Sequence, residues 1–198
     1  MKTIVGFLTT VVILAGGAAI AIYAGWYNVA AVAGFHPPLA WALHTTMEHS
    51  VRRRAANIVP PPNLPELASQ GFQDFDEMCV QCHGAPGKDR GEIGQGLAPE
   101  PPSLKEASQR WRPPEIFWIV KNGIHMTGMP AFGPTHDDDR IWKIVAFVSS
   151  LANVTAEQYK QLESTVSNAP AVHEEHVHEH EHQHEHQHEH SHGEPSHD

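Results

Sequence analysis

The sequence predicts an all-α protein made of an N-terminal apolar helix, a small helical domain and a polar C-terminal tail. Three observations lead to this prediction. Apolar residues recur at helical spacing in several separate segments. No segment shows the strict alternation of apolar and polar residues that marks a strand. The 198 residues suffice for one ordinary domain with appendages, and no internal repeat is present.

The N-terminal segment is apolar enough to cross a membrane. Residues 4–22 are apolar or small apart from two threonines, and Tyr23, Trp26 and Tyr27 follow where an interfacial belt would fall. A cleaved signal peptide is the alternative, because residues 19–21 have the small-x-small pattern of a cleavage site. We favour an uncleaved anchor over residues 1–27, since the apolar run exceeds the roughly 7–15 residues of a signal-peptide core.

Residues 28–63 are predicted to form an amphipathic helix and a proline-rich linker. One apolar stripe recurs every four residues and predicts a helix over residues 37–58; it consists of Leu39, Leu43, Met47, Val51 and Ala55. Two interpretations of this helix stay open: it packs on the domain, or it lies on the membrane with Arg52–Arg54 near lipid phosphates. The prolines between residues 60 and 65 predict a stiff spacer that lifts the next domain off the bilayer.

The pattern over residues 64–155 predicts one helical domain. Helical spacing resumes at Leu67, and the Gly- and Pro-rich residues 84–102 and 128–134 predict loops. Residues 113–122 start with proline and stop before Gly123, as a short helix does. Three aspartates at 137–139 open a further helix whose apolar stripe is Ile141, Trp142, Val145, Val148 and Leu151. Another short helix is predicted at 155–166, within a segment at 156–170 that leads to the tail.

The two cysteines and the residue after them carry the chemistry. Cys79 and Cys82 are the only cysteines, and His83 follows them, which gives C-x-x-C-H, the haem c attachment signature. Two thiols one helical turn apart can each form a thioether to a haem vinyl group, and the adjoining imidazole can then bind the iron. A thioredoxin-like pair is the first alternative, but its usual βαβ setting is absent. A zinc site is the second, and it needs two more ligands at suitable spacing.

A second axial ligand for the iron is expected downstream of the motif. The candidates are Met126, Met129, His125 and His136. We favour Met129, because Gly128 and Pro130 make a stiff, irregular loop that suits presentation of a thioether sulfur to iron. The ordinary role of a lone methionine is to fill a core.

The stretch from about Leu64 to Leu151 resembles the class I c-type cytochromes, especially bacterial membrane-anchored ones with one haem. The resemblance rests on Gly71-x-x-x-Phe75-x-x-x-Cys79-x-x-Cys82-His83, on residues 128–132 (Gly-Met-Pro-Ala-Phe) and on the closing helix with Trp142 and Phe147. It implies that Gly71 and Phe75 meet the Trp142–Ala146 face and that Pro102 and Leu104 wall the haem pocket. It also implies haem attachment outside the cytoplasm, with a single-pass anchor in the bacterial inner membrane and the C-terminal domain in the periplasm.

The C-terminal tail, residues 171–198, is rich in histidine. Histidines stand at alternate positions and are His176, His178, His180, His182, His184, His186, His188, His190 and His192. Its composition predicts disorder. Imidazoles at this density favour a poorly selective arm for zinc, copper or nickel, and a solvated tail with no set task is the alternative.

Charge and composition bear on which classes of function the chain can have. The net charge is −10, but eight of the 23 acidic residues lie from His173 onward, which leaves 15 against 13 basic residues elsewhere. No basic stripe with interleaved aromatics indicates nucleic acid binding. We therefore expect an electron-transfer component, not an enzyme alone, that exchanges electrons with a redox protein donor and acceptor. It would act as a carrier or as the haem subunit of a respiratory or dehydrogenase chain. The alternatives are a haem subunit with an open iron site for ligand binding, and a metal-handling protein that uses the tail.

Overall fold

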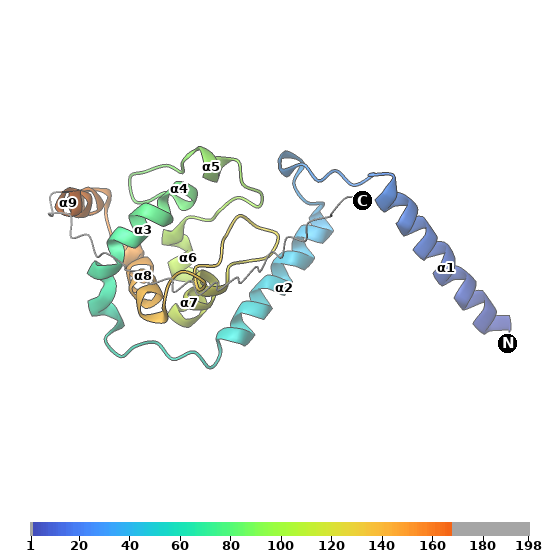
Figure 1. The fold of residues 1–198 in the computed structure, drawn as a ribbon, viewed down its shortest axis with the longest axis horizontal. Helices are drawn as coiled ribbons and strands as arrows, with labels where there is room; N and C mark the ends of the chain where they lie inside the picture. Colours follow the sequence, from blue (N-terminus) through green and yellow to red (C-terminus); the bar gives the residue numbers. More distant parts are fainter. Residues whose placement is uncertain (1, 168–198) are drawn as a thin grey trace, which may run out of the picture. The chain divides into compact units, whose positions relative to one another are not determined.

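A computed structural model of the chain describes residues 2–167 (Figure 1). Within them the regular structure is helical, and the single isolated bridge, Ala85 to Lys88, closes a tight turn. The all-α prediction is therefore confirmed. The α-helices are α1 Lys2–Tyr23, α2 Pro37–Ala55, α3 Phe72–Met78, α4 Val80–His83, α5 Glu92–Gln95, α6 Leu104–Arg110, α7 Pro113–Asn122, α8 Asp138–Ser150 and α9 Ala156–Ser167, with 3₁₀ turns η1 Ala31–Ala33, η2 Leu64–Gly71 and η3 Leu151–Asn153.

Helix α1 buries no side chain against the rest of the described chain. Its 22 residues, at a rise of about 1.5 Å each, give a length of about 33 Å. The helix is strongly apolar, so by length and composition it can cross the roughly 30 Å hydrocarbon core of a membrane.

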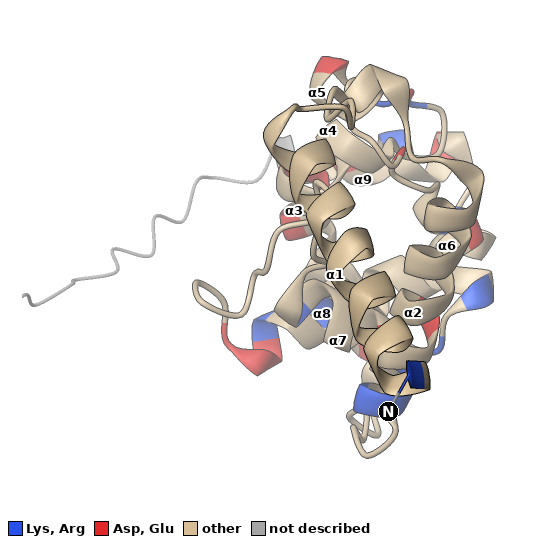
Figure 2. Ribbon diagram, turned by 90° about the vertical axis from the view of Figure 1, so that its right-hand side faces the viewer, with Lys and Arg blue, Asp and Glu red and all other residues tan. Residues whose placement is uncertain are grey.

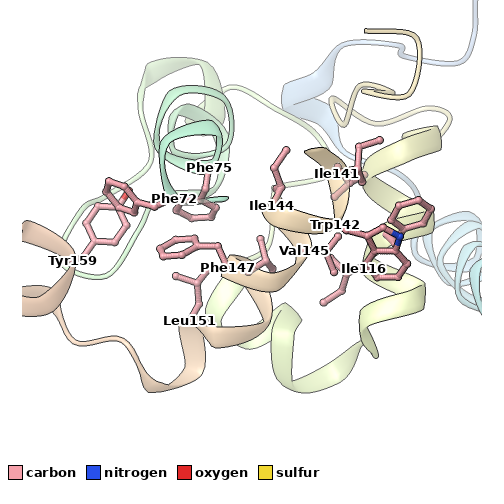
Figure 3. Close-up of a cluster of buried hydrophobic side chains, with 13 residues drawn as sticks. Phe72, Phe75, Ile116, Ile141, Trp142, Ile144, Val145, Phe147, Leu151 and Tyr159 are labelled. Carbon is pink, nitrogen blue, oxygen red and sulfur yellow. The ribbon is translucent and has the colours of Figure 1, made fainter. Parts of the chain in front are cut away.

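Helix α8 is the centre of the domain core. Asp137 caps its N-terminus, where the carboxylate accepts a hydrogen bond from the Arg140 backbone N–H at 2.8 Å. The stripe predicted from the sequence, from Ile141 to Leu151, is buried at every position. Helices α3, α6 and α7 and the turn η2 surround it (Figure 3). The 3.6-residue period thus identified the face that the domain covers.

The closest helix contact lies where Gly71 meets α8. A side chain at position 71 would overlap the Lys143 carbonyl and approach the Ile144 backbone nitrogen. Beside this contact, Phe72 and Phe75 pack on Phe147 with ring centroids 5.3 and 4.9 Å apart. The expected meeting of Gly71 with the Trp142–Ala146 face is confirmed.

Helix α2 packs on the domain through its C-terminal half. Val51 and Ala55 are buried, Arg52 lies over the Trp111 ring at 5.6 Å, and Glu48 forms an ion pair with Arg110. The predicted stripe is therefore buried at its end and exposed at its start, where Leu39 remains accessible. Because α2 precedes the prolines and contacts α7 after them, residues 56–63 return the chain to the same domain instead of spacing a separate domain away.

Helix α9 packs on the domain through a buried tyrosine, Tyr159. Tyr159 is 1% exposed, and its hydroxyl donates to the Asp76 Oδ1 atom at 2.5 Å. Lys88 pairs with Glu163 and lies 3.6 Å from Asp76. Burial, together with the Asp76 carboxylate, raises the pKa of Tyr159, so the phenol stays protonated. Helix α9 thereby ties the segments before and after the C-x-x-C-H motif together.

Two short helices, α5 and α6, were not predicted. Each spans two turns or fewer, and both lie in or beside the stretch from Gly84 to Pro102 that glycines and prolines mark as loop. So short a segment carries little periodicity, and tertiary packing decides its conformation.

Glu115 supplies a pH-dependent part of the domain's stability. Its buried carboxylate accepts the Arg112 backbone N–H at 2.8 Å and two guanidinium N–H groups at 3.0 and 2.7 Å. Burial alone would raise the pKa of Glu115, but the Arg112 bonds outweigh it and the pKa is lowered. The stabilisation is therefore complete above the unfolded-state pKa of about 4.3 and is lost as pH falls through the lower folded-state value.

We predict that Glu115→Gln lowers the free energy of unfolding at pH 7 by about 1.5–3 kcal/mol, the range for hydrogen bonds to a charged group. The difference from the native protein should begin to shrink below about pH 4, where the unfolded carboxylate takes up a proton, and should vanish once the folded carboxylate is protonated at lower pH. Denaturant unfolding of the haem-loaded protein across this pH range measures both effects. The exposed Glu106 provides the matched control, Glu106→Gln. A loss that is the same at every pH would contradict the assignment.

Candidate haem attachment site

Helix α4 brings both thiols and the imidazole together within one helical turn. The backbone N–H groups of Cys82 and His83 donate to the Cys79 carbonyl at 3.2 and 2.9 Å. Both cysteines are half-buried and are not joined to each other. After His83 the chain leaves the helix at Gly84, which has φ +68°, a conformation that favours glycine. The motif is therefore a rigid turn that holds three reactive side chains side by side.

His83 is held in the orientation that a metal ligand needs. Its Nδ1 atom lies 2.8 Å from the Pro102 carbonyl oxygen, which can only accept, so Nδ1 carries the proton and Nε2 keeps its lone pair. Burial lowers the pKa of His83, the Pro102 bond opposes this, and Arg90 adds to the lowering. The imidazole is thus neutral and fixed, as a ligating histidine with a backbone partner is.

The cysteines fit thioethers better than a zinc site. Burial, with smaller effects from Asp74 and Cys82, raises the pKa of the Cys79 thiol to about 12. Zinc binds the thiolate form, and a raised pKa opposes its formation. No group of three or more His, Cys, Asp or Glu side chains suited to a metal ion occurs within residues 2–167. The neutral Cys79 thiol and the half-buried position of both sulfurs therefore suit covalent attachment to an apolar group.

Helix α5 lies directly on the Cys82 backbone. A side chain at Gly94 would come within 2.6 Å of the Cys82 carbonyl oxygen and 2.8 Å of its Cα atom. The Gly91 N–H donates to the Gln81 carbonyl at 3.0 Å and fastens the start of α5 to α4. No local pattern singles out Gly94, since its role depends on a contact between two segments.

Met129 lies in a loop that is fixed at both ends. Its N–H donates to the Thr127 hydroxyl at 3.1 Å, and its carbonyl accepts the Ile124 N–H at 3.2 Å. Gly123 has φ +66°, and a side chain there would lie 2.8–2.9 Å from the backbone of residues 129–131. The Met129 side chain is half-buried against the core cluster. Thr127 was not anticipated, although Ser or Thr two residues before a loop position is a signal for such a turn.

The other axial candidates are placed less favourably. Met126 is 67% exposed and His125 is also exposed. His136 directs Nδ1 to the Thr135 hydroxyl at 2.8 Å, and its buried Nε2 atom has no hydrogen-bond partner within the described chain. Met129 and His136 therefore remain the two candidates that a spectrum must separate.

The two residues predicted to wall the haem pocket, Leu104 and Pro102, differ in burial. Leu104 is half-buried against the core, as a wall residue would be. Pro102 has an exposed ring, and its carbonyl group is what reaches His83. The tail histidines from His176 to His192 lie outside the described residues. Two thiols and a neutral imidazole on one helical turn fit a covalently bound haem, which Cys79, Cys82 and His83 would hold.

We predict that Gly94→Ala disrupts this site. The added methyl group would meet backbone atoms of Cys82 that cannot move without shifting the motif, so the free energy of unfolding should fall by about 1–3 kcal/mol. Gly96→Ala is the matched control, because a side chain there meets only ordinary contacts at 3.7 Å or more. Unfolding of the haem-loaded proteins and the yield of attached haem measure the effect. Equal behaviour of the two variants would show that α5 does not press on Cys82.

Comparison with known proteins agrees with this geometry. Residues 66–148 match the family model "Cytochrome C oxidase, cbb3-type, subunit III". Over 115 residues, 58% of this chain, it is 29% identical to the cbb3-type cytochrome c oxidase subunit FixP of Rhizobium meliloti (strain 1021). Over 116 residues it is 28% identical to FixP of Sinorhizobium medicae (strain WSM419).

The aligned part covers 38% of the length of each of these two relatives. No solved structure matches the chain. The family match begins in η2 and ends in α8, so it takes in the motif, the Gly71 contact and the Met129 loop and leaves out α1, α2 and α9. Residues 66–148 are therefore similar to a monohaem class I cytochrome c domain of the type found in subunit III of cbb3-type oxidases.

Proposed function

We propose that this protein carries electrons through one haem c, attached to Cys79 and Cys82 and ligated by His83 and Met129. The observation that carries the proposal is the His83 imidazole, oriented by the Pro102 carbonyl beside two thiols on the same helical turn. The haem supplies an iron that cycles between two oxidation states when bound. With both axial positions filled, the iron has no open site for a substrate.

The chain's own residues set the conditions for this role. The Pro102 carbonyl fixes the His83 ring and raises its basicity as a ligand. A methionine sulfur on the opposite side would raise the redox potential relative to a second histidine. The Thr127 and Ile124 bonds hold the Met129 backbone on both sides of the side chain that would bind the iron.

We also propose a cellular setting. Helix α1 serves as an uncleaved, single-pass anchor in a bacterial inner membrane, and the haem domain lies in the periplasm, where haem is attached to such motifs. The similarity to an oxidase subunit supports a place in a respiratory chain, either in a cbb3-type oxidase complex or beside one. The protein would take electrons from one redox protein and pass them to another.

We predict that the oxidised native protein shows the weak far-red band of methionine bound to iron(III), together with a c-type α-band after reduction. Met129→Leu should abolish the far-red band, lower the potential and allow rapid carbon monoxide binding to the reduced form. Met126→Leu, at an exposed position, is the control and should change none of these. A native spectrum without the far-red band would instead favour His136 as the ligand. Full carbon monoxide binding by the native protein would favour the function with an open haem site.

A second candidate function is metal binding by the tail, which rests on the density of alternating histidines in residues 176–192. Zinc, copper and nickel are the metals that such imidazoles favour. The haem domain would then serve a task in metal handling. This tail lies outside the described residues, so the sequence alone supports the proposal.

One experiment separates the two functions. We predict that deletion of residues 172–198 lowers the tolerance of cells to these metals and leaves oxygen uptake by their membranes unchanged. His83→Ala should do the reverse, because it removes an iron ligand and keeps the tail. If the deletion instead abolishes oxygen uptake and leaves metal tolerance intact, metal handling by the tail is wrong.

A further inference from the structure

An uncharged stretch continues well beyond the end of the spanning helix. No Asp, Glu, Lys or Arg occurs between Lys2 and Glu48. Helix α1 is uncharged after its N-terminal end, as Figure 2 shows. A length of about 33 Å already suffices for one crossing of the hydrocarbon core. Residues 24–47 therefore lie beyond that core and still lack the charges that a water-exposed segment usually carries.

Large apolar side chains in this stretch are exposed in the structure. Val29 and Val32 are 89% and 99% exposed, and Trp26 and Trp41 are 75% and 70% exposed. Trp41 lies in the first half of α2, and its neighbour Leu39 is accessible as well. An exposed apolar surface of this kind indicates a partner that removes it from water.

The backbone of the same stretch limits what that partner can be. Between Ala24 and His36 the regular structure is a single 3₁₀ turn, η1, so many backbone groups lack partners within a helix. Such a segment cannot sit in hydrocarbon, where no water is present to hydrogen-bond the unpaired backbone groups. Lipid headgroups and their water can hydrogen-bond these groups. Tryptophan, which joins a large apolar ring to one N–H donor, is enriched in this zone.

We propose that residues 24–41 lie in the interface between lipid and water on the outer surface of the membrane, with Val29, Val32 and Trp41 in contact with phospholipid. The proposal rests on the anchor role of α1 in the proposed function, and it adds a second, surface attachment that continues directly from that anchor. The occupant of the apolar surface is the bilayer, not another protein.

The surface attachment determines how the haem domain is held. The second half of α2 is fastened to the domain by buried Val51 and Ala55 and by the Glu48–Arg110 ion pair. The same helix therefore contacts lipid at its start and the domain at its end. The haem domain is kept close to the membrane by one helix of 19 residues, not by a flexible tether. Its redox partners are then membrane-bound, or they come to the membrane surface.

A single introduced thiol tests the proposal in the full chain. Cys79 and Cys82 are the only native cysteines, and thioether formation removes both thiols. Val32→Cys and Trp41→Cys would each carry an environment-sensitive fluorophore in haem-loaded protein reconstituted into phospholipid nanodiscs. Phe7→Cys in α1 is the control for the hydrocarbon core, and Arg53→Cys at the exposed end of α2 is the control for water.

We expect a shallow lipid nitroxide to quench the labels at 32 and 41 several-fold more than the label at 53. A deep nitroxide should quench the label at 7 most. Labels at 32 and 41 that respond only to aqueous iodide, like the label at 53, would overturn the proposal. Labels shielded from both lipid nitroxide and iodide would also overturn it and would indicate a protein partner.

Failure of the proposed function would look different. The native chain without an added cysteine takes up no label if the haem is attached, and it takes up label at Cys79 and Cys82 if the haem is absent. A label at position 7 that is missing from the mature protein would show cleavage of the N-terminal segment. These results are independent of whether residues 24–41 touch lipid.

Discussion

The close contact between Gly71 and α8 is the constraint on which the rest of the domain depends. Only a residue without a side chain allows the chain to pass the Lys143 carbonyl at this distance. The contact brings Phe72 and Phe75 onto Phe147 and so sets the direction of α3. Helix α3 leads directly to Cys79, and the position of the haem motif relative to the core is therefore fixed by packing at its base.

The same packing extends to the segments that flank the motif. Asp76, which precedes the cysteines, accepts the buried Tyr159 hydroxyl, and Lys88, which follows His83, pairs with Glu163 on the same helix. Gly94 lies against Cys82 from another side. The motif is thus held by contacts of the residues before it, of the residues after it and of Gly94. The Pro102 carbonyl sets the orientation of the His83 ring. A covalently bound, apolar haem would complete this core, because the domain itself is small and its cofactor adds buried surface.

Helix α2 lies outside the family match, and its two halves differ in what they contact. Helix α2 is packed on the domain at its C-terminal half and exposes Trp41 at its N-terminal half. The two interpretations that the sequence left open, packing on the domain and lying on the membrane, therefore concern different halves of one helix. The domain contact is shown by the structure, and the lipid contact is our proposal. Under the proposed function, the two contacts together would hold the haem domain close to the membrane.

Local patterns in the chain sufficed for several features. Helical periodicity predicted the buried face of α8 from Ile141 to Leu151, and Pro113 and Gly123 marked the ends of α7. The structure confirms these two predictions, because each depends on residues near one another in the chain. The spacing of Cys79, Cys82 and His83 likewise predicts the cofactor from neighbouring residues. The tertiary structure alone decided the Pro102 bond to His83, the contact of Gly94 with Cys82, the Tyr159 bond to Asp76 and the return of residues 56–63 to the domain. Each of these joins segments that no local pattern relates, because contacts between distant segments are fixed by the packing of the whole core.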